Sequence, residues 1–129
     1  MTEPLVVVGG SVAGVNAAEG ARRAGWTGDI CLLEAQAAAP YDRPPLSKQL
    51  LAGEWQPEQI HLRPEAFWKE MEIYVRAGVH VDRLEQDEDL LVTREGERIP
   101  FSGLVVATGC SARTLGTISG ATSLQPPNA

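Results

Sequence analysis

Short apolar runs, each ended by glycine or by an acid, are the clearest feature of the hydrophobic pattern. Leu5–Val8 precedes a glycine pair, residues 29–34 spell Asp-Ile-Cys-Leu-Leu-Glu, and Leu104–Ala107 precedes Thr-Gly. Continuous aliphatic and β-branched runs of this length are typical of strands buried on both faces of a parallel sheet. We therefore expect residues 5–8, 30–34 and 104–107 to share one parallel sheet.

A helix is predicted between the first two runs, from Val12 to Ala24. This segment consists of small or helix-favouring residues, its apolar positions recur at helical spacing, and Gly25 suits the turn after a helix. The strand, helix and second strand then form a βαβ unit with a right-handed crossover. A further helix is expected from about Pro64 through Glu70, because proline is tolerated in a first helical turn.

The rest of the pattern predicts a proline-rich loop and several short strands. Prolines prevent regular structure over Pro40–Lys48. Short strands are expected at 73–75 and 79–81, and a hairpin should pair 90–93 with 98–99. We expect the small β-meander near residues 90–100 to lie apart from the parallel sheet. The predicted fold class is α/β, a partial Rossmann-like three-layer domain.

Charge and cysteine content exclude several function classes. The 129-residue chain has a net charge of −6, which argues against nucleic-acid and anionic-membrane partners, since both favour a basic surface. No apolar run approaches the roughly 18 residues needed to span a bilayer, and the N-terminus does not resemble a signal peptide. Cys31 and Cys110 lie far apart, so we expect reduced structural thiols in a cytoplasmic protein, and no metal site.

The first candidate functional motif is a glycine fingerprint between the first predicted strand and the first predicted helix. Gly9-Gly10-Ser11-Val12-Ala13-Gly14 follows the pattern GxGxxG, with serine at the second glycine. Such a loop permits a tight turn, lets backbone approach a pyrophosphate and directs a helix N-terminus at the phosphates. Glu34 ends the next strand, where a carboxylate can accept hydrogen bonds from ribose hydroxyls. A glycine turn in an unrelated α/β protein is the alternative, and the motif does not distinguish FAD from NAD.

The proline-rich loop carries a more specific signal. Its sequence, Pro-Tyr-Asp-Arg-Pro-Pro-Leu-Ser-Lys over 40–48, resembles the FAD-dependent reductases that pass electrons from NADH to ferredoxins or rubredoxins. Residues 25–30, 60–64 and 107–109 are also similar to this family. The resemblance covers about residues 5–124, nearly the whole chain. It implies an FAD-binding domain whose partners are NADH and a ferredoxin or rubredoxin.

The resemblance also implies roles for individual residues. Arg43 matches an arginine that contacts the FAD diphosphate and the adenosine side. Lys48 matches a lysine beside the isoalloxazine, and its catalytic role would be to stabilise the negative charge of the reduced flavin. Val81 matches a position whose backbone holds the adenine edge. The family turn Ala107, Thr108 and Gly109 would lie against the cofactor, and Arg113 matches an arginine that follows it.

Some of these residues also have simpler interpretations, and the adenosine side departs from the family pattern. Lys48 could be a solvated surface lysine, Arg43 could pair with its neighbouring aspartate, and Val81 could be an ordinary strand valine. The family often places its ribose-side acid one or two residues after Glu34, where this chain has Ala35 and Gln36. Glu34 can take over that contact, because related flavoproteins use a glutamate at this strand end.

The domain expectation is an incomplete FAD-binding domain over residues 1–116, followed by a disordered tail over 117–129. The chain has one glycine fingerprint, whereas the family needs a second dinucleotide-binding fold for NADH. We therefore expect the FAD-binding portion of an NAD(P)H-dependent ferredoxin/rubredoxin-type reductase that is inactive by itself. The alternative is a free-standing nucleotide-binding or interaction module without turnover.

Overall fold

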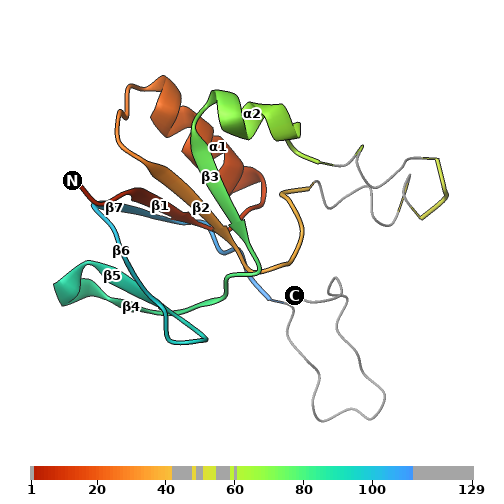
Figure 1. Cartoon of the computed structure of the whole chain (residues 1–129). Coiled ribbons are helices and arrows are strands. Elements are labelled where there is room, and N and C mark those ends of the chain that lie inside the picture. Colours follow the sequence, from red (N-terminus) through yellow and green to blue (C-terminus); the bar gives the residue numbers. More distant parts are fainter. Residues whose placement is uncertain (1, 42–47, 49–50, 55–58, 60, 112–129) are drawn as a thin grey trace, which may run out of the picture.

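A four-stranded parallel sheet forms the centre of the molecule (Figure 1). The computed structural model describes residues 2–41, 48, 51–54, 59 and 61–111. The elements in chain order are β1 (Leu5–Val8), α1 (Val12–Arg23), β2 (Ile30–Glu34), α2 (Glu65–Glu70), β3 (Ile73–Ala77), β4 (Val81–Glu85), the 3-10 turn η3 (Gln86–Glu88), β5 (Leu90–Thr93), β6 (Arg98–Pro100) and β7 (Gly103–Val106).

The strand order of the parallel sheet is β3-β2-β1-β7. Leu5 pairs with Ile30 on one side and with Gly103 on the other, so the three predicted strands lie side by side. The last strand begins and ends one residue earlier than predicted, because it stops level with the end of β1. The Ala107 N–H still donates to the Val8 carbonyl at 2.8 Å. The predicted parallel sheet is thus confirmed, and β3 adds a fourth strand beside β2.

Both faces of the parallel sheet are covered, which is why β1 is buried along its whole length. Leu5 and Val7 point to the face that packs against the two helices, and Val6 and Val8 point to the opposite face. Alternate side chains of a strand point to opposite faces, so a continuous apolar run needs a layer on each side. Burying each such side chain contributes about 1.5–3 kcal/mol.

A three-stranded antiparallel sheet in the order β4-β5-β6 forms the third layer and lies across the face opposite the helices (Figure 1). Leu91 and Ile99 from this sheet pack against Val6, Val8 and Leu33. The predicted three layers and the separate meander are therefore confirmed. The prediction of a strand at 79–81 was wrong in extent, because the observed strand, β4, begins at Val81 and continues to Glu85.

The two helices on the other face are fixed at their ends by one arginine. Gly25 has a φ of 106°, as expected of the residue after a helix. The Arg22 guanidinium donates to the carbonyls of Trp26 at 2.6 Å, Gly28 at 3.0 Å, Met71 at 2.8 Å and Glu72 at 2.9 Å. Arg22 therefore joins the end of α1 to the turn between α2 and β3.

We expect Arg22→Met to lower the free energy of unfolding by about 2–4 kcal/mol, because hydrogen bonds from a charged group contribute strongly and four carbonyls lose their donor. The matched control is Arg23→Met. Arg23 is exposed and makes an i,i+4 ion pair with Glu19, so its loss should change stability by less than about 0.5 kcal/mol. Urea denaturation of both variants measures the difference, and equal effects would contradict this role for Arg22.

Candidate functional site

The glycine loop between β1 and α1 is packed so closely that it leaves no room for side chains at two positions. Gly9 has a φ of 111°, and a Cβ built on it would overlap the carbonyl oxygen of Ala107. A Cβ on Gly14 would overlap the carbonyl oxygen of Gly9. The loop, the first turn of α1 and the end of β7 are therefore in direct backbone contact. This arrangement keeps side chains out of the turn at the carboxyl ends of the strands, which is where α/β sheets bind their ligands.

The Glu34 carboxylate holds the loop from the side of β2. One oxygen accepts a hydrogen bond from the Gly10 N–H at 2.8 Å, and the other accepts from the Gln36 N–H at 3.1 Å. The residue is 8% exposed. A carboxylate has roughly four acceptor positions, so two remain for other donors. The predicted ribose-side acid is thus attached directly to the glycine loop.

The amino end of α1 is available to an anion. Among the described residues, the Ser11 side chain makes no capping hydrogen bond, and no acid occupies the first turn. Val12 is 53% exposed and Ala13 is exposed as well. The unpaired first-turn N–H groups and the positive end of the helix dipole can therefore receive a negatively charged group.

Two further segments predicted to bind the cofactor converge on the same end of the sheet. Ala107, Thr108 and Gly109 follow β7, and the latter two are exposed. On the other side, the Val79 N–H donates to the Glu34 carbonyl at 2.9 Å, which brings the start of β4 at Val81 towards the end of β2. Ala35 is exposed between Glu34 and Gln36.

The remaining predicted residues are not brought into this cluster by the described part of the structure. Arg43 and Arg113 lie outside the described residues, as does the expected tail over 117–129. Lys48 is exposed, and its backbone carbonyl accepts from the Ala52 N–H at 3.0 Å. Within the described residues, no contact joins the Lys48 ammonium to the glycine loop. Its role near a flavin stays a prediction.

Sequence reasoning missed how the long loop is closed at its base. Tyr41 forms an antiparallel bridge with His61, and the Leu62 N–H donates to the Pro40 carbonyl at 3.0 Å. Arg63 then binds Glu19 of α1 at 2.7 Å, which lowers the pKa of the Glu19 carboxyl. The family-like residues 60–64 were the available signal, because they follow the loop and contain this arginine.

The Tyr41 hydroxyl also contributes a link that the sequence did not predict. It donates to the Gln36 side-chain oxygen at 2.7 Å, and Gln36 is joined through its backbone to Glu34. Hydrogen bonds therefore run from the glycine loop through Glu34 and Gln36 to the first residues of the proline-rich loop. A glutamine and a tyrosine five residues apart in a loop carry no pattern that would have indicated this.

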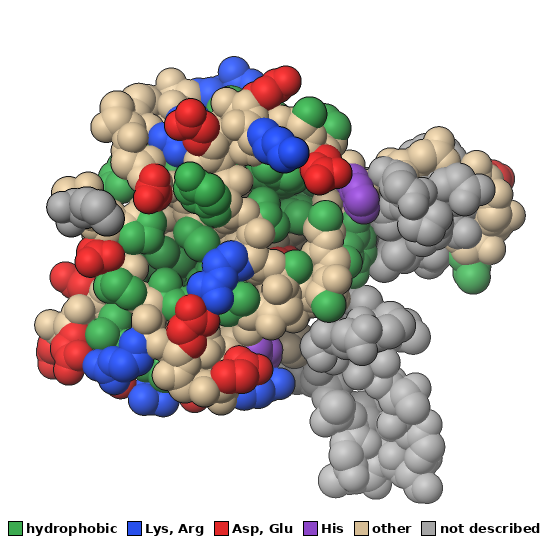
Figure 2. All heavy atoms as spheres, in the orientation of Figure 1, with side chains coloured by type: hydrophobic (Ala, Val, Ile, Leu, Met, Phe, Trp, Pro, Cys, Tyr) green, Lys and Arg blue, Asp and Glu red, His purple; other side chains and the backbone are tan. Residues whose placement is uncertain are grey.

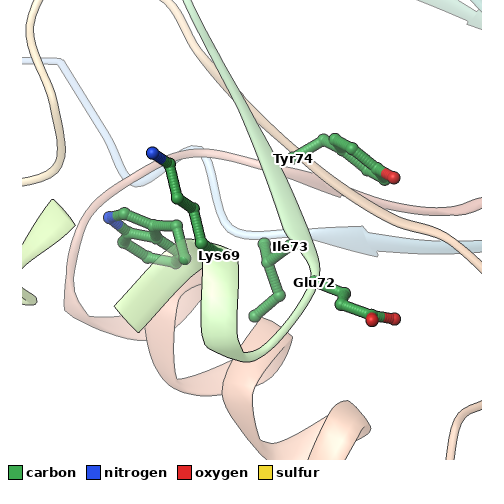
Figure 3. A pocket seen from close by; sticks show the side chains of 5 residues that line it. Lys69, Glu72, Ile73 and Tyr74 are labelled. Atoms are coloured by element: carbon green, nitrogen blue, oxygen red, sulfur yellow. The ribbon is translucent and has the colours of Figure 1, made fainter. Parts of the chain in front are cut away.

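Other surface features do not belong to this site. Figure 2 shows acidic and basic side chains interspersed on the face in view, so this face presents no large field of one sign. A pocket of about 300 Å³ is lined by Trp68, Lys69, Glu72, Ile73 and Tyr74 (Figure 3). It lies at the beginning of β3, whereas the glycine loop lies at the carboxyl ends of the parallel strands. No helix in the described part of the chain is both long and apolar enough to cross a membrane.

We expect Gly14→Ala to lower the free energy of unfolding by about 2–4 kcal/mol and to abolish dinucleotide binding, because the new methyl group would push α1 away from Gly9. The control is Gly20→Ala in the same helix, where a Cβ meets nothing within 4 Å. That change should stabilise the chain by about 0.5–1 kcal/mol. Urea denaturation and ligand titration test both. An unchanged Gly14→Ala variant would show that the close packing is not needed.

Comparisons with known proteins agree with this arrangement. Residues 3–127 match the family model described as pyridine nucleotide-disulphide oxidoreductase. The chain is 37% identical over 111 residues to the rubredoxin-NAD(+) reductase of Pseudomonas putida, covering 86% of this chain and 29% of that protein. It is 36% identical to a ferredoxin–NAD(P)(+) reductase of Sphingomonas sp., covering 86% of this chain and 27% of that protein. The chain thus spans less than a third of the length of these relatives.

Solved structures give the same result. The reductase in the covalent putidaredoxin reductase–putidaredoxin complex superposes with a TM-score of 0.83 at 34% identity, covering 92% of this chain and 28% of that one. The Rhodopseudomonas palustris ferredoxin reductase for the CYP199A2 system superposes with a TM-score of 0.80 at 30% identity, covering 88% and 28% of the two chains. Because the family model matches nearly the whole chain and the fold and glycine loop agree with it, this chain belongs to the pyridine nucleotide-disulphide oxidoreductase family.

Proposed function

We propose that the chain is the FAD-binding portion of an NAD(P)H-dependent ferredoxin/rubredoxin-type reductase, which passes electrons from NADH through FAD to a small iron–sulfur protein. The observation that carries the proposal is the convergence of three backbone segments at one end of the sheet. Gly9 packs on Ala107, Gly10 donates to Glu34, and the open first turn of α1 faces the same place. A dinucleotide needs this combination of close backbone approach, a free helix end and a ribose acceptor.

The residues present fit the pyrophosphate of FAD. Side chains at Gly9 and Gly14 would fill the space in which loop and strand backbones meet. Residues 10–14 would hold the two phosphates through backbone N–H groups and the helix dipole, without any basic side chain from the loop itself. The predicted contact from Arg43 would add a charged hydrogen-bond donor on the same side.

The adenosine would lie across the end of β2. Glu34 is buried, already fixed by the Gly10 and Gln36 N–H groups, and retains acceptor positions for ribose hydroxyls. The segment that leads into Val81 is bonded to the same strand end through Val79. Backbone groups at Val81 would then meet the adenine edge, as the resemblance implies.

The catalytic assignment rests on the flavin end of the site. Bound FAD supplies hydride acceptance and the passage of electrons onward one at a time. Ala107, Thr108 and Gly109 would pack small residues against it, and Arg113 would follow them. The ammonium of Lys48 would lie near the flavin N5, where a positive charge stabilises the negative charge of the reduced ring.

The proposed partners follow from the relatives. Rubredoxin and NAD(+) appear in the name of the Pseudomonas putida relative, and ferredoxin and NAD(P)(+) in that of the Sphingomonas relative. An NADH site would have to come from sequence outside the single glycine fingerprint of this chain. The chain would thus contribute residues that bind the flavin. The reductase activity is proposed for a protein that contains this chain together with an NADH site.

We expect the 129-residue chain to bind FAD with a dissociation constant of roughly 0.1–1 mM, because it spans less than a third of the length of its relatives and would supply only part of their binding energy. Flavin fluorescence titration measures this, with ADP as the competitor. The same sample should not oxidise NADH with ferricyanide as acceptor, since the one glycine fingerprint of the sequence is assigned to FAD and a second one would be needed to orient the nicotinamide. FAD binding that ADP cannot compete would contradict the proposed site.

A chimera distinguishes a reductase segment from a nucleotide-binding module without turnover. Residues 1–111 of this chain replace the matching segment of the Pseudomonas putida rubredoxin-NAD(+) reductase, to which the chain is 37% identical. We expect a yellow protein that reduces rubredoxin with NADH. The matched control carries Gly14→Val and should lose the flavin. A folded chimera that holds FAD but transfers no electrons would favour the module.

In the same chimera, we expect Lys48→Met to leave FAD affinity roughly unchanged and to shift the flavin reduction potential negative. The lost ammonium no longer stabilises the reduced ring, and a shift on the order of 30 mV corresponds to about 1.4 kcal/mol for a two-electron couple. Lys69→Met, on α2 at the other end of the sheet, is the control and should leave the potential unchanged. Redox titration decides, and a positive shift or none would remove Lys48 from this role.

A further inference from the structure

The parallel sheet ends at β3, and the outer edge of this strand is open. β3 is the last strand in the order β3-β2-β1-β7 and pairs with β2, and no strand in the described part of the chain pairs with its other side. An open edge presents a row of N–H and C=O groups to which another strand can bind. Proteins usually prevent such pairing with charged side chains, bulges, prolines or very short edge strands.

The edges of the antiparallel sheet carry these protections, whereas β3 does not. β4 has charged residues at three of its five positions and a register shift between Val81 and Arg83. β6 has only three residues and ends in Pro100. β3 has five residues, no proline and a regular register with β2 along its whole length. Its edge is therefore suited to accept a partner strand.

The register of β3 with β2 shows which backbone groups lie along this edge. The Glu34 carbonyl accepts from the Val79 N–H, so Glu34 directs its polar groups towards β3. In a parallel pair, a residue bonds to the neighbours of the residue opposite it, and that opposite residue directs its own N–H and C=O away. Ala77 lies opposite Glu34, so Ala77 and, by alternation, Val75 and Ile73 direct their N–H and C=O groups to the free edge.

The side chains of β3 differ between its two faces. Ile73 and Val75 pack on the side of the helices, and Figure 3 shows Ile73 and Tyr74 on opposite sides of the strand. Tyr74 is 61% exposed. Arg76 lies on the same face as Tyr74 and binds Glu97 of the hairpin at 2.9 Å. An aromatic ring and a cation two residues apart thus occupy one face of an open edge.

We propose that β3 pairs antiparallel with β3 of a second copy of this chain, about a two-fold axis at Val75. The axis sets Val75 opposite its own equivalent, in a pair that exchanges both backbone hydrogen bonds. Tyr74 then lies opposite Arg76 of the second copy, in the closer kind of antiparallel pair, whose side chains touch. The guanidinium stacks on the tyrosine ring with its flat face and keeps Glu97 at its edge.

Self-complementarity is the reason for choosing a second copy as the occupant. The two-fold axis forms the Tyr74–Arg76 contact twice, once on each side of Val75. β7, at the other edge of the sheet, consists of Gly-Leu-Val-Val and offers no such pair of ring and cation. The hollow at the beginning of β3 also leaves space beside Ile73, where the axis sets the exposed Ala77 of the second copy.

The first test is sedimentation equilibrium of the whole 129-residue chain between about 10 μM and 1 mM. We expect a reversible monomer–dimer equilibrium with a dissociation constant of roughly 0.1–1 mM, because one pair of short strands buries less area than a standard interface. A chain that stays monomeric at about 1 mM would overturn the proposal.

The sign of a charge placed at Tyr74 distinguishes this pairing from non-specific association. Tyr74→Lys puts a cation opposite Arg76 and should weaken the dimer about five- to tenfold. Tyr74→Glu supplies an opposite charge and should keep the dissociation constant within about twofold. General repulsion between chains of net charge −6 predicts the reverse order, since a lysine lowers that charge and a glutamate raises it. The reverse order, or equal effects, would overturn the proposal.

Leu84→Lys is the matched control for this comparison. Leu84 is an exposed apolar residue, at 44% exposure, on β4, and its replacement makes the same change in net charge as Tyr74→Lys. We expect Leu84→Lys to leave the dimer at least as stable as that of the unaltered chain. A loss equal to that of Tyr74→Lys would show that the charge effect is not local to β3.

Two further measurements test the axis itself. Val75→Pro removes the N–H at the axis without removing a bond to β2, is tolerated on an edge strand, and should abolish the dimer. If this variant does not fold, the Tyr74 pair of variants carries the comparison. In a mixture of isotope-labelled and unlabelled chains, a nuclear Overhauser contact should join the α-protons of Tyr74 and Arg76 of different copies. A dimer whose intermolecular contacts lie on β7 or on the helices would overturn the assignment to β3.

Discussion

The close backbone contact between Gly9, Gly14 and Ala107 is the constraint on which the rest of the site depends. It requires that β1 and β7 be adjacent and parallel, that α1 begin directly after the turn, and that no side chain intervene. Those conditions in turn require both faces of the sheet to be covered, because β1 is apolar along its whole length. The helices and the antiparallel sheet therefore act as supports for one loop.

Glu34 connects this packing to the proposed ribose contact. A buried carboxylate at the end of β2 would be costly if unpaired, and here two backbone N–H groups satisfy part of its hydrogen-bonding capacity. One of those groups belongs to the glycine loop and the other to Gln36. The same acid thus fixes the loop and keeps further acceptor positions, so in the proposed site the rigidity of the loop and the contact to the ribose would come from one residue.

Ion pairs and hydrogen bonds at the periphery fix segments that the core does not reach. Arg22 joins the ends of the two helices, and Arg63 joins the base of the long loop to α1. Arg76 and Glu97 join β3 to the hairpin at 2.9 Å, which raises the pKa of the arginine and lowers that of the acid. Each link connects two elements far apart in sequence, and together they place the loop base, the helix ends and the sheet edge.

The sequence by itself determined the parallel sheet, α1, the glycine loop and the position of Glu34, because burial on both faces and the need for glycine leave strong local patterns. It misjudged the extent of β4, because charged residues at three of its five positions hide the strand, and it did not assign β3 to the sheet. Only the tertiary structure decided that Tyr41, Gln36 and Glu34 form one hydrogen-bonded chain and that His61 closes the loop. Such contacts depend on how distant segments pack, and single polar residues in loops carry no periodicity that could announce them.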